Sequence, residues 1–263
     1  MNYWRQSPTN IYVAAHRGWS AKYPENTMAA FKAALELGVD QIETDVRVSK
    51  DGELVLFHDP VVERKTNGVG RVEHLTLAEL KALKIGNGGQ IATFIEFMDL
   101  VKDHPTITLD IELKIYPNPG QEELSYSVCD RVLKIVDEYN FTHRCVINSF
   151  SAKLHEYIQD TYGNKYKQHV YFPKKLLRMC SRDPYAYAYC VAANDLFDGY
   201  ISVEDAIEEA RQFREETGAR MWVGVEANTE ENINLVRKMG AELITCNDPD
   251  NVLAILRKMH LHD

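Results

Sequence analysis

The chain has 263 residues, of which 45% are hydrophobic, 30 are Lys or Arg and 39 are Asp or Glu. The net charge of −9 argues against non-specific nucleic-acid binding, which needs a basic surface, but not against one local pocket for a phosphate compound. No apolar run approaches the ~18 residues of a membrane span, so we expect no integral membrane association. The five cysteines lack zinc-type spacing, and we expect reduced, mostly buried thiols. Because no signal-peptide pattern opens the chain, we also expect a cytoplasmic protein.

Short apolar runs alternate with longer amphipathic segments along the chain. The runs predicted as strands are residues 11–15, 41–48, 53–58, 106–113, 144–150, 168–172, 198–202, 220–225 and 242–246. Helices are predicted between most of them, at residues 26–38, 76–83, 122–139, 151–163, 203–218 and 229–240. This alternation indicates an α/β protein in which helices cover a parallel sheet.

The second and third predicted strands form a special pair. The segment that joins them contains Asp51 and Gly52, a hairpin signal, so the third strand is expected to return antiparallel to the second. The remaining eight strands match the number in a closed (β/α)8 TIM barrel. An open doubly wound sheet is the alternative, but no glycine-rich nucleotide loop follows the first strand.

Two segments fit the repeat less well. We interpret residues 59–92, which are rich in glycine and contain one short helix, as a small insertion after the strand-two hairpin. Residues 173–196 are irregular and rich in tyrosine. No linker divides the chain, so residues 1–263 are expected to form one barrel domain.

Acidic residues gather near the C-terminal ends of two predicted strands. Alternation places Glu43 and Asp45 on one face of the first strand, and Asp110, Glu112 and Lys114 on one face of the other. Neighbouring carboxylates repel one another unless positive charge lies between them. A salt bridge would explain any one of these acids, but two acidic strands favour a site for a hard divalent cation, Mg²⁺, Ca²⁺ or Mn²⁺.

Two histidines and two cationic residues accompany these acids. His16 ends the first predicted strand and His58 ends the hairpin return, so the pair are candidates for a general base and a general acid, although a single such histidine is more often a capped or exposed residue. Arg17 and Lys114 could bind phosphate oxygens or simply neutralise the acids. The combination suggests cleavage of a phosphodiester, because cationic groups would stabilise charge on the phosphoryl oxygens while a histidine protonates the leaving oxygen.

The chain resembles the glycerophosphodiester phosphodiesterase family. The matching segments are His-Arg-Gly at 16–18, Pro-Glu-Asn-Thr at 24–27, and residues 43–59, 66–83 and 110–114, with looser matches at 148–150 and 240–250. The resemblance covers nearly the whole chain and implies a TIM barrel with an insertion after the strand-two hairpin. Each motif is weak alone, but their order and spacing together are specific.

The resemblance also implies roles for individual residues. The ligands that it implies for one divalent cation are Glu43, Asp45 and Glu112. The acid–base pair that it implies consists of His16 and His58, and the implied phosphate contacts are Arg17 and Lys114. Supporting positions are implied for Glu25 and Asn26, either of which could instead cap the first helix.

The second half of the chain departs from the family pattern. Trp222 is present, but Glu226 stands in a run that usually contains Thr or Asn. Facing the pocket, Glu226 would disfavour a second anionic group on the substrate, whereas at the start of a helix it would be a favourable first-turn acid. We expect Phe150, Phe172 and Trp222 to line a pocket for the alcohol, although aromatic residues at strand ends are more often part of the core.

We therefore predict metal-dependent hydrolysis of small glycerophosphodiesters to glycerol 3-phosphate and an alcohol, with water or the glycerol 2-hydroxyl as the nucleophile. The sequence distinguishes neither the acid from the base nor one head group from another. A lysophospholipase D is less favoured, because a basic amphipathic face is lacking. The same residues would also suit a diesterase for a different polyol phosphate, or a barrel that binds a phosphate compound without catalysis. A metal-dependent sugar isomerase is disfavoured, because no acid/His cluster follows residue 114.

Overall fold

The computed structural model describes the chain except for residues 1–3, 5–9, 87, 194–202 and 225–226. The strands are β1 (Tyr12–His16), β2 (Gln41–Val48), β3 (Leu54–Leu56), β4 (Thr108–Leu113), β5 (Cys145–Asn148), β6 (Lys167–Phe172), β7 (Cys190–Ala193), β8 (Arg220–Val223) and β9 (Ala241–Cys246). The α-helices are α1 (Met28–Leu37), α2 (Leu77–Ala82), α3 (Phe94–Val101), α4 (Glu122–Glu138), α5 (Ala152–Tyr162), α6 (Val203–Thr217), α7 (Glu230–Lys238) and α8 (Pro249–Lys258). The short 3₁₀ turns are η1 (Val72–His74), η2 (Gly163–Lys165), η3 (Lys174–Leu176) and η4 (Pro184–Tyr187).

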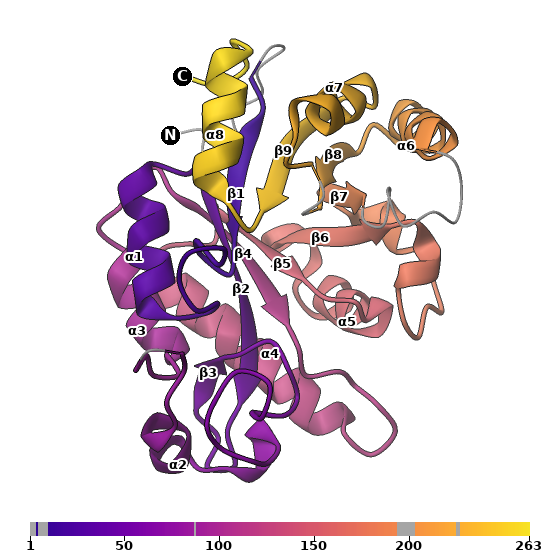
Figure 1. Ribbon diagram of the computed structural model, residues 1–263. Coiled ribbons are helices and arrows are strands. Elements are labelled where there is room, and N and C mark those ends of the chain that lie inside the picture. Colours follow the sequence, from indigo (N-terminus) through magenta and orange to yellow (C-terminus); the bar gives the residue numbers. More distant parts are fainter. Residues whose placement is uncertain (1–3, 5–9, 87, 194–202, 225–226) are drawn as a thin grey trace.

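Within the described residues, the parallel strands close into a ring. The order runs from β1 through β9, β8, β7, β6, β5 and β4 to β2, and β2 pairs with β1 again. Strand β3 pairs antiparallel with the end of β2, as the hairpin signal predicted. Figure 1 shows the helices on the outside of this ring. The predicted TIM barrel is therefore confirmed.

Helix α1 shows how local chemistry sets the limits of an element. Its N-cap is Thr27, whose side chain accepts a hydrogen bond from the backbone N–H of Ala30. The expectation that Glu25 or Asn26 caps this helix is therefore wrong. The helix ends at Gly38, which adopts the left-handed conformation with φ 78°, as expected for a glycine after the last turn.

Apolar side chains form one layer outside the strands and another inside the barrel. The outer layer, which includes Ile42 and Ile111, lies between the strands and the helices. The interior cluster includes Trp222, on which Trp4 stacks with ring centroids 6.1 Å apart. Trp4 also donates from Nε1 to the carbonyl of His143, just before β5, at 2.7 Å. The interior is thus filled from the end where the strands begin.

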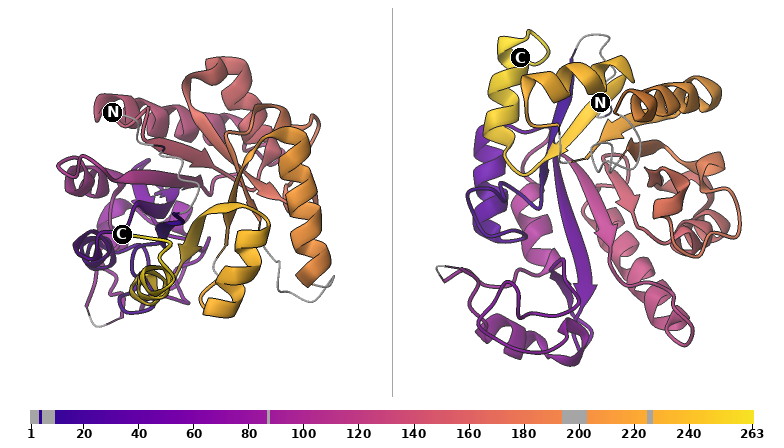
Figure 2. Two further views of the ribbon diagram at one scale, coloured as in Figure 1. Left: turned by 90° about the horizontal axis from the view of Figure 1, so that it is seen from above. Right: turned by 45° about the vertical axis from the view of Figure 1, so that its right-hand side comes forward.

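The segment between β3 and β4 builds a small apolar core of its own. Its buried residues Phe57, Val62, Val72, Leu80, Ile85 and Ile91 pack with Val55 of β3. Helix α2 begins with a capping box, in which Thr76 and Glu79 satisfy each other's backbone N–H groups. Figures 1 and 2 show this segment at the end of the barrel toward which the arrowhead of β2 points. The insertion therefore lies at the face where barrels of this kind carry their active sites.

Two parts of the chain differ from the sequence prediction. The strand after β6 is β7, inside the stretch that we expected to be irregular, and the strand predicted at 198–202 lies outside the described residues. The four residues of β7, Cys-Val-Ala-Ala, contain a single β-branched side chain and give a weak strand signal. Between β6 and β7, residues 173–189 form η3 and η4 and no α-helix. Helices α3 and α8 were not among the predicted helices.

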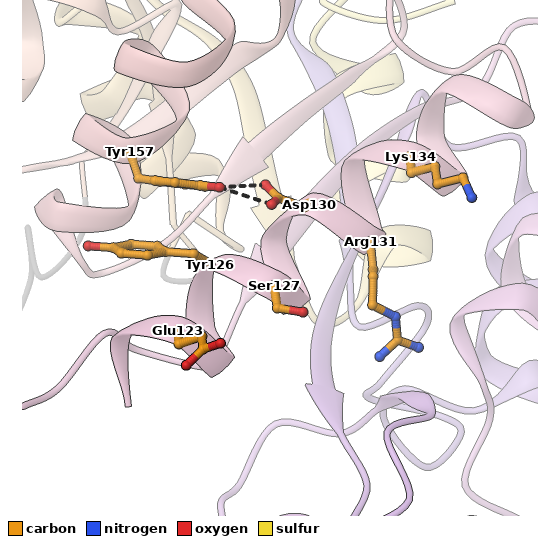
Figure 3. Close-up of a pocket in the computed structure, with 7 residues that line it drawn as sticks. All are labelled: Glu123, Tyr126, Ser127, Asp130, Arg131, Lys134 and Tyr157. Carbon is orange, nitrogen blue, oxygen red and sulfur yellow. Dashed lines mark hydrogen bonds between the residues drawn. The ribbon is translucent and has the colours of Figure 1, made fainter. Parts of the chain in front are cut away.

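A hollow on the outside of the barrel lies between helices α4 and α5 (Figure 3). Tyr126 of α4 and Tyr157 of α5 stack with ring centroids 4.1 Å apart, and the Tyr157 hydroxyl donates to the Asp130 carboxylate at 2.9 Å. These contacts join the two helices.

Of the five cysteines, Cys180 is exposed and the other four are buried, as expected, and all are free thiols. None of the helices that the structure describes combines the length and hydropathy needed to span a bilayer.

Candidate active site

Strand register brings the acidic residues together. In the parallel pair β2–β4, Glu43 lies opposite Asp110 and Asp45 lies opposite Glu112. Because side chains alternate along a strand, these residues share the face that points into the barrel. Ligand atoms of Glu43, Asp45 and Glu112 all lie within 4.8 Å of one another, and all three side chains are buried. The sequence prediction that these three carboxylates converge agrees with this geometry.

Two cations lie against this carboxylate cluster. Arg17 Nε is 3.1 Å from Asp45 Oδ2, and Lys114 Nζ is 2.5 Å from Glu112 Oε1 and 3.2 Å from Asp45 Oδ1. Three carboxylates and two cations leave one net negative charge when all are ionised. A divalent cation would change that balance to one net positive charge, which matches a phosphodiester monoanion.

Burial and neighbouring charges set the protonation of the three carboxyl groups. Burial raises the pKa of Glu43 well above its ordinary value, and Asp45 beside it raises the pKa further. Burial would also raise the pKa of Asp45, but Lys114 and Arg17 outweigh it and hold that pKa below the usual range. Burial raises the pKa of Glu112, although Lys114 opposes the shift. The cluster is therefore short of positive charge, which a bound cation would supply.

The turn after β1 places Arg17 through its backbone. Arg17 has φ 59°, and its N–H donates to Glu43 Oε2 at 2.9 Å, while its carbonyl accepts from the N–H of Asn26 at 3.0 Å. Gly18 follows with φ 77°, and a Cβ there would lie 2.7 Å from the backbone carbon of Ala30. Glycine is thus required at this position. The His-Arg-Gly motif is a turn that aims a guanidinium at the cluster.

The Pro-Glu-Asn-Thr segment supports the site from behind. Asn26 is buried, donates from Nδ2 to Asp45 Oδ2 at 2.8 Å and accepts from the Thr44 hydroxyl at 2.9 Å. Glu25 lies nearer the rim, with Oε1 3.2 Å from Nη1 of Arg17. Asn26 therefore orients a carboxylate of the cluster, and Glu25 orients the cation beside it.

Both predicted histidines are held through Nδ1. His16 Nδ1 lies 2.7 Å from Oδ1 of Asn247 in the loop after β9, and its Nε2 lies 3.8 Å from Glu43 Oε2. His58 Nδ1 lies 2.7 Å from Oδ1 of Asp59. Both partners accept hydrogen bonds, so each Nδ1 carries a proton and each Nε2 is the nitrogen that can exchange one.

Burial favours the neutral form of both imidazoles. It lowers the pKa of His16 to about 4, and the Arg17 guanidinium reinforces the shift. Burial also lowers the pKa of His58, although Asp45 opposes the shift. The hydrogen bond from Arg64 lowers the pKa of Asp59 to about 2, so this carboxylate stays ionised beside His58.

These groups meet in a cavity of about 240 Å³ at the C-terminal face of the barrel. The predicted site residues that line it are His16, Arg17, Glu43, His58, Glu112, Lys114 and Phe150. Asp45 lies behind them and is fully buried. The structure therefore brings the predicted catalytic, phosphate and metal residues into one place.

The structure does not bring the other two predicted aromatic residues to the cavity. Trp222 is 1% exposed and packs in the barrel interior, with its ring centroid 5.2 Å from that of His169. Phe172 points to the outer layer, where it packs against Phe213 with ring centroids 5.1 Å apart. Strand alternation separates Phe172 from Tyr171, which faces inward. Glu226 lies outside the described residues.

The sequence analysis missed His169 and Tyr171 on β6. His169 Nδ1 lies 2.6 Å from Asp110 Oδ2, while its buried Nε2 has no hydrogen-bond partner and lines the cavity. The Tyr171 hydroxyl donates to Glu112 Oε2 at 3.4 Å, and its ring stacks on Phe150 with centroids 3.8 Å apart. Their spacing of two on a predicted strand was the signal available, because it places both on one face.

A (β/α)8 barrel with carboxylates, histidines and two cations at its strand ends is typical of barrel enzymes that act on phosphate esters. Residues 16–251 match the sequence model of the glycerophosphoryl diester phosphodiesterase family, and the chain belongs to that family.

Individual relatives agree with this assignment over nearly the whole chain. A glycerophosphodiester phosphodiesterase of Caldanaerobacter subterraneus subsp. tengcongensis is 34% identical over 255 residues, which are 94% of this chain and 98% of the relative. The crystal structure of glycerophosphodiester phosphodiesterase from Thermotoga maritima is 25% identical, with a TM-score of 0.72 over 95% of this chain and 100% of that one. An Oleispira antarctica phosphodiesterase in complex with the product sn-glycerol-3-phosphate is 22% identical, with a TM-score of 0.75 over 94% and 97%. The two structures share the fold of this chain.

Proposed function

We propose that this chain hydrolyses small glycerophosphodiesters to glycerol 3-phosphate and an alcohol with the help of one divalent cation. The family, the name of the Caldanaerobacter relative and the product bound to the Oleispira protein support the substrate class. The observation that carries the proposal is the convergence of three buried carboxylates, two cations and two histidines on one cavity.

The residues proposed to hold the cation are Glu43, Asp45 and Glu112. Carboxylate oxygens suit Mg²⁺, Ca²⁺ or Mn²⁺, and Glu43 Oε1 is buried without a hydrogen-bond partner. The cation would polarise a phosphoryl oxygen and offset the negative charge that builds there. Asn26, through its bond to Asp45, keeps one carboxylate oriented toward that position.

Arg17 and Lys114 are proposed to bind the non-bridging phosphate oxygens. Burial would lower the pKa of Lys114, but Glu112 and Asp45 outweigh it and raise the pKa, so the ammonium stays charged. The side chain of Arg17 is 15% exposed and lines the cavity beside the cluster. Both groups are held by ion pairs with the carboxylates, so little reorganisation is needed as charge develops.

His16 and His58 are proposed to move the protons. One neutral imidazole accepts the proton of the attacking oxygen, which belongs to water or to the glycerol 2-hydroxyl, as the new P–O bond forms. The other imidazole, in its protonated form, gives its proton to the alcohol oxygen as the old P–O bond breaks. When the 2-hydroxyl attacks, water then opens the cyclic phosphodiester and gives glycerol 3-phosphate. The fixed Nδ1 contacts leave Nε2 for these transfers.

The proposal is tested by measuring glycerol 3-phosphate release from glycerophosphocholine, glycerophosphoethanolamine and glycerophosphoglycerol. EDTA should abolish the activity, and one of Mg²⁺, Ca²⁺ or Mn²⁺ should restore it. His16→Ala and His58→Ala should each lower kcat by about 10²- to 10⁴-fold, whereas the exposed His104→Ala should not. The proposal fails when no diester yields product with any of the cations, or when both site variants keep wild-type rates.

A further inference from the structure

A second cavity adjoins the candidate active site. Its volume is about 460 Å³, and it shares His58, Lys114 and Phe150 with the first cavity. Its other walls come from β2, from the insertion, from the loops after β4 and β6 and from the start of α4. A phosphodiester has two arms, so a phosphate held at the shared wall could extend one arm into each cavity.

The two cavities differ in size and lining. The first is smaller, lies over the carboxylate cluster and has the polar side chains of Asn148, His169 and Thr245 on its walls. Such a space suits the glycerol arm, which is the same in every substrate of this class. The second cavity has about twice the volume and therefore suits the alcohol arm, which varies.

Positive charge predominates in the second cavity. Arg47, Arg71 and Arg178 all line it, and Glu73 is the one acid among the described residues of its wall. Three guanidinium groups against one carboxylate leave an excess of two positive charges, before Lys114 is counted. On a chain with a net charge of −9, this cavity is a local reversal of sign.

The three arginines are placed differently. Arg47 is buried and donates to the carbonyl of His58 at 2.6 Å and to that of Lys114 at 3.4 Å, so it builds the wall between the cavities. Arg71 pairs with Glu73 at 2.9 Å and keeps a partly exposed side chain. Two guanidinium groups, those of Arg71 and Arg178, thus lie where a ligand can reach them.

The position of Arg178 is fixed by its backbone. Its N–H donates to the carbonyl of Phe150 at 2.7 Å, and its carbonyl accepts from the N–H of Ala152 at 2.9 Å. Its guanidinium carbon lies 5.4 Å from the centre of the Tyr116 ring. A cation therefore already lies near this ring and would repel a quaternary ammonium group that approached it.

Resting on the function proposed above, we infer that the second cavity is the subsite for the alcohol arm and that it selects an arm with its own phosphate or carboxylate group. Guanidinium groups bind such anions through paired, charge-assisted hydrogen bonds. A choline or ethanolamine arm carries positive charge and is repelled by the same groups. Arg71 and Arg178 are the residues that distinguish an anionic arm from a neutral or cationic one.

The test compares two substrates that differ by one phosphate group. These are glycerophosphoinositol and glycerophosphoinositol 4-phosphate, with glycerophosphocholine as the cationic arm. We expect kcat/KM for the phosphorylated arm to exceed that for the neutral one by about tenfold or more, mainly through KM. Glycerophosphocholine should be the poorest of the three, and added salt should reduce the differences.

Variants that remove the charge of Arg71 or Arg178 test whether these residues cause the preference for the phosphorylated arm. In the double variant Arg71→Gln/Arg178→Gln, the ratio of kcat/KM between the phosphorylated and the neutral arm should fall to about one, and each single variant should give an intermediate ratio. Lys134→Gln, on the outer face of α4 (Figure 3), is the matched control. It removes one positive charge from a side chain that is 75% exposed and should keep the wild-type ratio.

The outcomes separate this inference from the proposed function. Hydrolysis of all three substrates at similar efficiency, or an unchanged ratio in the double variant, overturns the subsite and leaves the function standing. Should no substrate be hydrolysed, calorimetric titration with inositol 4-phosphate decides. Binding that the double variant loses and Lys134→Gln retains supports the subsite, and equal or absent binding overturns it.

Discussion

Asp59 is expected to set the efficiency of His58 without contacting substrate. Its carboxylate lies 2.7 Å from Nδ1 of His58, and the hydrogen bond from Arg64 lowers its pKa to about 2, so it is ionised at any working pH. The charge fixes the tautomer with the proton on Nδ1 and stabilises the imidazolium when Nε2 takes a proton.

The expected loss in Asp59→Asn follows from that hydrogen bond. A hydrogen bond to a charged group contributes about 1.5–3 kcal/mol, which corresponds to about a 10- to 150-fold change in rate. The amide keeps the shape of the carboxylate but removes the charge, and its NH₂ group can turn toward Nδ1 and favour the wrong tautomer. We therefore expect kcat to fall in this range with a smaller change in KM.

Steady-state kinetics across pH distinguishes positioning from a general loss of structure. Asp59→Asn should shift to lower pH the limb of the rate profile that reports His58, because the imidazolium loses its counter-charge. Asp59→Glu should restore part of the rate, and Asp99→Asn, a surface acid on α3 that is 50% exposed, should match the wild type. A kcat within twofold of wild type in Asp59→Asn, with an unchanged pH profile, would refute the role.

Other parts of the molecule give further expected outcomes. His262 Nε2 donates a hydrogen bond to Oδ2 of Asp40 at 2.9 Å, and this bond raises the folded-state pKa of His262. The stability from this pair is therefore full below the unfolded pKa near 6.5 and is lost as pH rises through the folded value. His262→Gln should therefore lower the free energy of unfolding by about 1 kcal/mol at pH 5.5 and by less at pH 9 in urea titrations, and a pH-independent difference would contradict this. Gly18→Ala should lower the free energy of unfolding by at least about 2 kcal/mol in the same urea titrations, because φ is 77° and the new Cβ would lie 2.7 Å from the backbone of Ala30. A smaller decrease would show that the turn relaxes. With a thiol reagent, the folded chain should react rapidly at Cys180 alone, and rapid labelling of a second thiol would contradict the burial of the other four.

The carboxylate cluster could be predicted from the sequence because a strand imposes a period of two. Glu43, Asp45 and Glu112 had to share faces within their strands, and the parallel pairing of β2 with β4 set them side by side. The TIM barrel was predictable for the same reason, since the alternation of strands and helices repeats along the chain. Both features depend on local patterns that many residues repeat.

The contacts that the sequence left open join residues far apart in the chain. His169 pairs with Asp110 across 59 positions, and His16 pairs with Asn247 across 231, so neither pair leaves a local pattern. Trp222 faces the barrel interior, as the alternation along its strand predicts. Its ring stacks with Trp4 in the interior cluster and does not line the cavity. That depth within the barrel depends on the assembled fold and cannot be read from the strand pattern.

The lining residues of the first cavity can be predicted from the sequence better than those of the second, and the difference has a physical cause. Residues over the carboxylate cluster come from strand ends, whose spacing is fixed by hydrogen bonds between strands, so their geometry changes little when a loop changes. The second cavity takes Arg71 from the insertion and Arg178 from the loop after β6, where chain length and direction are set by contacts of the loop itself. Substitutions at these arginines are therefore expected to alter the preferred alcohol arm while Glu43 and Glu112 keep their positions. On this reasoning, the bond that is cleaved and the arm that is preferred are separable properties of the chain.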